Sequence, residues 1–295
     1  MKVAVLFYGQ MRFVNNPWPV KSHKQLESIY DVSYFGHLWN SNSDKLKHVS
    51  SWSRIKGNPF TSNDLGQLKK NYNFISLEIE EPIDFLVTQR DKIDKIQNIQ
   101  SKIGRKVNKE TNLRDLSNTI SHIYSMEKSI KRFLNYENAK DYDWVILSRT
   151  DNFIVRFPDL RSLDISQDAI FISAHHDNFP DTVILSTPKN VKSLLAYSKL
   201  DEMINFSPPV ITGAAEKFKQ VSIQLCNPKV DILSLRINPE SIKDICVIIN
   251  DDIVGMQRAE LQSGLYSRFV RHYDLPPSRD HDISLANKEV WQPKE

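Results

Sequence analysis

The chain has 295 residues, of which 40% are hydrophobic and 25% are charged, and its formal net charge is +3. This composition is typical of globular proteins, and the length suits one large α/β domain or two smaller ones. The near balance of acidic and basic residues disfavours a dedicated nucleic-acid-binding protein, which usually carries a basic excess on one face. No stretch approaches the ~20 apolar residues that span a membrane, and the N-terminus lacks the pattern of a signal peptide, so we expect a cytoplasmic protein.

The first part of the chain predicts a strand–helix–strand unit. Residues 3–8 form a continuous apolar run that ends at Gly9, as in a central strand buried on both faces. A helix is predicted near 21–29, and a second strand over 30–39. A further strand is predicted over 74–79. This order indicates a doubly wound sheet.

Apolar residues at helical spacing predict an amphipathic helix over 85–103 and a longer one over 113–136. A short apolar run over 144–147 then predicts a buried strand, which leads into Ser148-Arg149-Thr150-Asp151-Asn152. Three more strands are predicted over 169–173, 182–186 and 245–250, and two more helices over 188–197 and 213–225.

Together these elements predict an α/β fold with an open, mostly parallel central sheet flanked by helices. We expect one domain over 1–273, with a helical insertion at about 84–140, and a polar C-terminal tail over 274–295.

Open α/β sheets bind ligands at the carboxyl ends of their strands, so polar residues that follow the apolar runs are candidate site residues. Four segments qualify: Gly9–Arg12, His37–Asn40, Arg149–Asn152 and His175–Asp181. In the first of them, the guanidinium of Arg12 suits phosphate because it can hold two oxygens at once. A plain surface turn with a solvated Arg12 is the alternative.

Arg149 and Asp151 come where the chain leaves a buried strand. An aspartate in such a place can bind Mg²⁺ or Mn²⁺, which favour oxygen ligands and often share a diphosphate. Arg149 could neutralise the same phosphates. The alternative is an Arg–Asp pair that only holds the loop.

Several common nucleotide and hydrolase motifs are absent from the sequence. It has no GxxxxGK[ST] and no GxGxxG after the first strand, which disfavours a P-loop nucleotidase and a standard dinucleotide fold. It also has no GxSxG, which argues against an α/β-hydrolase.

The order of the motifs resembles the GT-A-like glycosyltransferases of bacteria, phages and large viruses. The resemblance covers about two thirds of the chain, to about residue 200, and is carried by the order of loosely matching motifs. These are the strand and loop to Gly9–Arg12, the segment of Tyr30-Asp31-Val32 with Phe35, His37 and Trp39, the helix around Ser121–Lys131, the run Tyr142–Asp151, and Asp181–Pro188.

The resemblance implies transfer of a sugar from a nucleotide-sugar donor to a hydroxyl of a glycan or lipid-linked acceptor, as in surface polysaccharide synthesis. The leaving diphosphate needs a cation or a clamp of basic side chains. The donor-binding residues would be Gly9, Gln10, Arg12, His37, Arg149 and Asp151. Asp151 would also hold Mn²⁺ or Mg²⁺, but this family usually carries Asp-x-Asp, and here only one carboxylate remains.

If the reaction inverts the sugar, a carboxylate must accept the proton of the acceptor. Asp181 is the first candidate for this base, and Glu216 is the second. Two other functions stay open. One is a catalytically inactive GT-A-like protein that serves as a binding or scaffold protein. The other is a nucleotidyltransferase, which normally needs a Gly-rich basic loop after the first strand.

Overall fold

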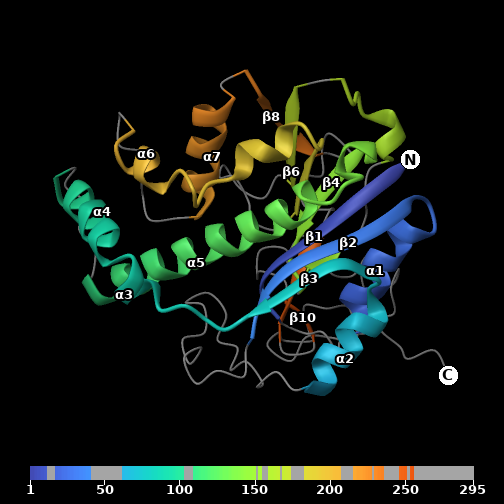
Figure 1. Cartoon of the computed structure of the whole chain (residues 1–295), viewed down its shortest axis with the longest axis horizontal. Helices are drawn as coiled ribbons and strands as arrows, with labels where there is room; N and C mark the ends of the chain where they lie inside the picture. Colours follow the sequence, from blue (N-terminus) through green and yellow to red (C-terminus); the bar gives the residue numbers. More distant parts are fainter. Residues whose placement is uncertain are drawn as a thin grey trace, which may run out of the picture.

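The computed structural model describes residues 1–11, 17–40, 62–102, 109–150, 152–154, 159–166, 168–173, 183–206, 215–227, 229–235, 246–250 and 253–255. Its centre is a seven-stranded sheet with helices on both faces (Figure 1), which confirms the predicted α/β class. Among the described residues, no helix is both long enough and apolar enough to cross a membrane.

The seven strands lie in the order β3-β2-β1-β4-β7-β6-β8. All neighbours pair in parallel except β7, which is antiparallel to both β4 and β6. The sheet is therefore mostly parallel, as predicted. Its strands are β1 (Lys2–Gln10), β2 (Asp31–Trp39), β3 (Phe74–Glu80), β4 (Trp144–Ser148), β6 (Ala169–Ser173), β7 (Val183–Ser186) and β8 (Asp231–Leu235).

A second, antiparallel sheet has the order β10-β9-β5. It contains β5 (Asn152–Ile154), β9 (Cys246–Asn250) and β10 (Ile253–Gly255). Since β5 begins four residues after β4 ends, the chain passes from the large sheet to the small one within the segment that follows Ser148.

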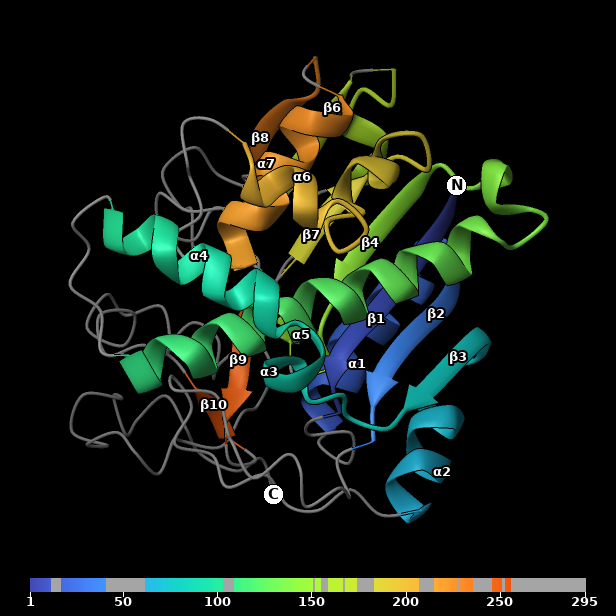
Figure 2. The same cartoon turned by 60° about the vertical axis from the view of Figure 1, so that its left-hand side comes forward.

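The helices cover the two faces of the large sheet. They are α1 (Pro17–Glu27), α2 (Ser62–Asn71), α3 (Phe85–Thr88), α4 (Arg90–Lys102), α5 (Lys109–Leu134), α6 (Leu200–Ile204) and α7 (Ala215–Cys226), with short 3-10 segments η2 (Ala139–Asp141), η3 (Leu160–Ser162) and η4 (Asn190–Leu194). Figure 2 shows α5 crossing one face of β1, β2 and β3. The helical stretch expected as an insertion thus includes a helix that packs on the central strands.

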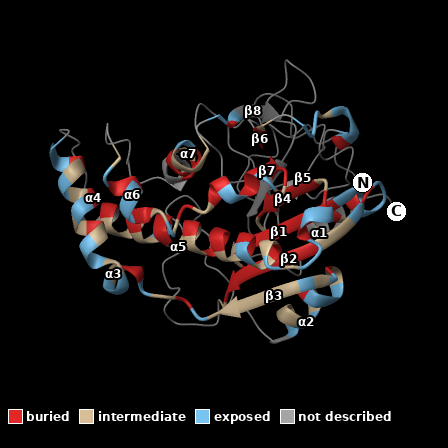
Figure 3. Cartoon of the chain, turned by 45° about the horizontal axis from the view of Figure 1, so that its top comes forward, coloured by how far each residue is buried: buried red, intermediate tan, exposed pale blue. Residues whose placement is uncertain are grey.

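Alternate residues of β1 belong to two different cores. Val3, Val5 and Phe7 pack with Leu26 of α1 and Leu68 of α2. On the opposite face, Ala4, Leu6 and Tyr8 pack with Met126, Ile130 and Phe133 of α5. A strand covered on both faces has no exposed side, which explains its continuous apolar sequence. Figure 3 shows the middle of β1 and all of β4 buried, whereas the edge strand β3 is only half-buried.

Two predicted helices differ from the observed ones. The stretch 85–103 is divided at Gln89 into α3 and α4, and the side chain of Asp84 caps α3 by accepting from the amides of Leu86 and Val87. The α-helix predicted over 188–197 is wrong, because the chain there forms the 3-10 segment η4. The predicted tail over 274–295 lies outside the described residues.

Candidate functional site

The strand order reverses direction between β1 and β4, because the chain first builds β2 and β3 on one side of β1 and then β4 on the other. In open α/β sheets, the crevice at the carboxyl ends of such a pair is the usual ligand site. Gly9 and Gln10 end β1, and Ser148 and Arg149 lie at the end of β4. We call this place the β1/β4 crevice.

Gly9 turns the chain at the end of β1. Its φ angle is 94°, in the left-handed region that favours glycine. Its backbone amide donates a hydrogen bond to Oγ of Ser125 on α5, at 2.7 Å. An added Cβ at Gly9 would meet no atom within 4 Å, so the backbone conformation, rather than space, favours glycine here.

A buried hydrogen-bond network holds the segment after β4. Oγ of Ser148 lies 3.2 Å from Nε2 of His23 on α1, and Nδ2 of Asn152 donates to the same oxygen at 3.1 Å. All three side chains are fully buried. Ser148 is therefore inaccessible to a substrate, and this His–Ser pair anchors the chain rather than forming a nucleophile.

Two further bonds hold the same segment, one within it and one to β1. The amide of Asn152 donates to the carbonyl of Arg149 at 3.2 Å. The hydroxyl of Thr150 donates to the carbonyl of Gln10 at 3.3 Å. The ends of β1 and β4 are thus tied together directly, and the predicted residues Gly9, Gln10 and Arg149 share one edge of the sheet.

The structure describes the other predicted site residues only in part or not at all. Arg12, Asp151 and Asp181 lie outside the described residues. Glu216 belongs to the first turn of α7, but its side chain is outside the described part of the chain. The segment 174–182, which holds His175–Asp181, is likewise not described.

His37 is fully buried between the sheet and α5. Its Nδ1 lies 2.9 Å from Oγ of Ser125, and its Nε2 lies 2.7 Å from a carboxylate oxygen of Glu80. Burial lowers the pKa of His37 below its ordinary value, although Glu80 opposes this effect. Because both ring nitrogens contact protein groups, His37 influences the crevice through Ser125, which also bonds Gly9.

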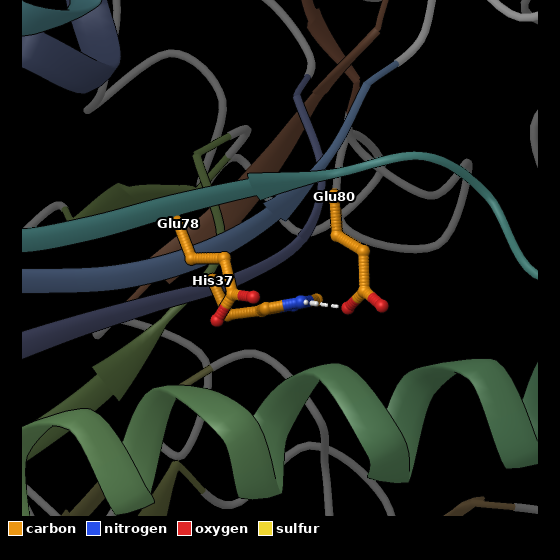
Figure 4. A group of neighbouring side chains, drawn as sticks. All are labelled: His37, Glu78 and Glu80. Carbon is orange, nitrogen blue, oxygen red and sulfur yellow. Dashed lines mark hydrogen bonds and ion pairs between the residues drawn. The ribbon is translucent and has the colours of Figure 1, made fainter.

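His37, Glu78 and Glu80 form the group whose ligand atoms lie within 4.8 Å of one another (Figure 4). Such a set could hold a metal ion by its chemistry and spacing. We did not expect it from the sequence. The signal was present in β3, where Ser76, Glu78 and Glu80 alternate with apolar residues at the spacing of one strand face.

The charges around this group disfavour a metal. Arg132 donates to Glu78 from Nε at 3.0 Å, and Nζ of Lys128 lies 3.8 Å from Glu78 and 4.0 Å from Glu80. Partial burial raises the pKa of Glu78, but Arg132 and Lys128 outweigh it and the pKa lies below its usual value. Two cations thus already balance two carboxylates, and a divalent ion would be repelled by both.

No protein-family model matches this chain, and no curated protein matches it.

Proposed function

We propose that this protein is a GT-A-like glycosyltransferase that uses a nucleotide-sugar donor. The observation that carries the proposal is the bond from Thr150 to the carbonyl of Gln10, which joins the carboxyl ends of β1 and β4 where the strand order reverses. Nucleotides commonly bind to open α/β sheets at this point. The sequence motifs that resemble the glycosyltransferase family, from Gly9 and from Arg149, converge there.

In this proposal the donor diphosphate lies across the β1/β4 crevice. Arg149 and Arg12 would bind its oxygens with their guanidinium groups, which suit phosphate. Asp151 would bind the donor ribose or an Mn²⁺ or Mg²⁺ ion, and the ion would neutralise charge on the leaving diphosphate. The carboxylate oxygens of Asp151 are ligands that such hard cations accept.

The reaction forms a bond between an acceptor oxygen and the anomeric carbon of the sugar, and it breaks the bond from that carbon to the diphosphate. With inversion, the acceptor proton passes to a carboxylate. The topology supports Asp181 for this role. It precedes Val183 by two residues, and Val183 pairs with Ser148, so the chain enters β7 at the crevice edge of the sheet.

Glu216 stays the second candidate base. Only four residues join the end of α7 to β8, so Cys226 lies near the amino edge of the sheet. The first turn of α7 then lies toward the carboxyl edge, because β8 runs parallel to β6 and β1. This placement supports Glu216 without favouring it over Asp181.

The test is a panel of UDP-, GDP- and CMP-sugars, with and without Mn²⁺, measured for binding and slow hydrolysis. We expect Asp151→Ala to weaken binding or hydrolysis at least about tenfold, which corresponds to about 1.4 kcal/mol. Asp141→Ala, at an exposed site in η2, is the matched control and should behave as wild type. If the wild-type protein binds no donor, the proposal is wrong.

The segment Arg149-Thr150-Asp151-Asn152 has only one carboxylate. This favours one alternative function, a GT-A-like protein that binds nucleotides without catalysis. Such a protein would bind a nucleoside diphosphate but would not hydrolyse any sugar nucleotide. The same panel separates the two functions.

A further inference from the structure

A concave surface lies between the edge strand β3 and the C-terminal half of α5. It has a volume of about 770 Å³, and its lining includes none of the residues of the β1/β4 crevice. This size falls within the range of small-ligand sites, roughly 300–1,000 Å³. We call it the β3/α5 groove. The chemistry of its walls indicates what it can bind.

Three half-buried tyrosines contribute the aromatic part of the groove: Tyr124, Tyr136 and Tyr197. Tyr197 packs edge-on against Tyr124, with ring centroids 4.8 Å apart, and its hydroxyl accepts from Gln89 at 3.1 Å. The hydroxyl of Tyr124 donates to Glu80 at 3.1 Å. The rings of Tyr124 and Tyr197 are therefore held in fixed orientations. Tyr124 stacks on Trp39, and Nζ of Lys128 lies 5.4 Å from its ring centroid, so its hydroxyl is the part that it offers to a ligand.

The charged residues of the groove are paired with one another. Nζ of Lys131 lies 2.6 Å from Oε1 of Glu127, and the amide of Ser198 donates to the other oxygen of Glu127 at 2.8 Å. Arg132 of the same helix donates to Glu78 of β3, so this pair joins the two walls of the groove. Glu127 is only 3% exposed, so this pair is anchored in the protein.

This pairing excludes two classes of ligand. An anionic ligand would find each lining cation already engaged, because Lys131 and Arg132 hold carboxylates at short distance and Nζ of Lys128 lies 3.8 Å from Glu78 and 4.0 Å from Glu80. A lipid chain would strip water from ion pairs without replacing its hydrogen bonds, which is costly. A neutral ligand rich in hydroxyl groups meets neither difficulty. Each hydroxyl can donate to a carboxylate and accept from Lys or Arg. The C–H faces of a sugar ring can pack on Tyr136 and Tyr197 of the lining.

We infer that the β3/α5 groove binds a neutral oligosaccharide. The binding itself is independent of the transferase activity. The groove would also hold the acceptor glycan at a point distant from its reacting hydroxyl, and this second role rests on the proposed function. The geometry permits that role, since Tyr124 in the groove is followed by Ser125, which bonds Gly9 of the crevice.

The experiment titrates the full chain with cellohexaose, maltohexaose and N-acetylchitohexaose, with tetragalacturonate as an anionic comparison, by calorimetry. We expect at least one neutral hexasaccharide to bind more tightly than tetragalacturonate. Asn135→Ala, at an exposed position of the groove, should weaken this binding about threefold to tenfold, as expected for one lost hydrogen bond. Asn118→Ala, at an exposed position of α5 outside the groove, is the matched control.

Lys131→Ala, with Lys140→Ala as its control outside the groove, repeats the test on a charged residue. Circular dichroism of every variant checks the fold. The inference is overturned if no neutral hexasaccharide binds, if tetragalacturonate binds more tightly, or if variant and control weaken binding equally. Hydrolysis of the sugar-nucleotide donor is measured in parallel. If the protein hydrolyses a donor but binds no oligosaccharide, only this inference is refuted. If it binds an oligosaccharide but no donor, only the proposed function is refuted.

Discussion

The backbone amide of Gly9 and the hydroxyl of Ser125 are joined by a 2.7 Å hydrogen bond across 116 residues of sequence. Ser125 also donates to the carbonyl of His37 at 2.9 Å, so a single buried side chain of α5 connects the ends of β1 and β2. The positions of the carboxyl ends of β1 and β2 therefore depend on α5.

Replacing Ser125 by Ala should destabilise the protein. The change removes the partner of the half-buried amide of Gly9 and of the buried carbonyl of His37, which costs roughly 1–3 kcal/mol. Chemical denaturation gives the free energy of unfolding. Ser129→Ala is the control, because Ser129 is equally buried on the same helix and its hydroxyl has no hydrogen-bond partner in the described structure. Equal losses in both variants would contradict the role of Ser125.

Two glycine substitutions should change stability in opposite directions. Gly9→Ala places a side chain at a φ angle of 94° and should cost roughly 1–2 kcal/mol. Gly66→Ala lies inside α2 with open space around the new Cβ, and it should stabilise by roughly 0.5–1 kcal/mol. Thermal unfolding measures both. A neutral Gly9→Ala would show that the turn relaxes without strain.

His37 makes stability depend on pH. Burial lowers its pKa from 6.5 in the folded chain, so below pH 6.5 the unfolded chain takes up the proton first. The stability that the neutral ring contributes is full above pH 6.5 and is lost as pH falls toward the folded pKa. Glu78, Glu80 and Lys128 are the charged groups that act on the ring. Unfolding free energies at several pH values should fall less steeply below pH 6.5 for His37→Gln than for wild type. Parallel slopes would refute the prediction.

Zinc and manganese ions should not stabilise the protein through His37, Glu78 and Glu80. Lys128 and Arg132 already compensate the two carboxylates, so an added divalent ion gains little. The measurement is the melting temperature of wild type and Glu80→Gln with each ion, and we expect the same response from both. A rise of several degrees in wild type that Glu80→Gln abolishes would instead identify a metal centre.

Local sequence patterns predicted the central strands and the long helix well. The apolar run of β1 and the stripe of α5 reflect burial, which a periodic pattern records directly. The failure at η4 has a physical reason. Four of its five residues, including Asn190 and Ser193, are buried, so no exposed face separates it from the core and packing sets its tighter turn. The break between α3 and α4 at Gln89 could not be predicted, because no glycine or proline stands there.

The sequence predicted only part of the candidate site, and the reason differs from that for the secondary structure. Gly9, Gln10 and Arg149 follow apolar strands, and that position alone identified them. The bonds of His23 to Ser148 and of Ser125 to Gly9 join residues separated by 125 and 116 positions. Such contacts follow from the packing of α1 and α5 on the sheet, and no local pattern records them. The edge strand β8 of the large sheet, the short strands β5 and β10, and the helices α2 and α6 were likewise not predicted.

The reversed direction of β7 has a consequence for how this protein could diversify. The connection over 174–182 leaves the sheet at Ser173 and returns at Val183 beside Ser148, so it starts and ends on the same rim. Its length and composition can change without shifting the register of β6 or β7, since loop length affects closure entropy only weakly. If the protein is the proposed glycosyltransferase, exchange of this one segment is expected to alter substrate preference while the scaffold stays unchanged.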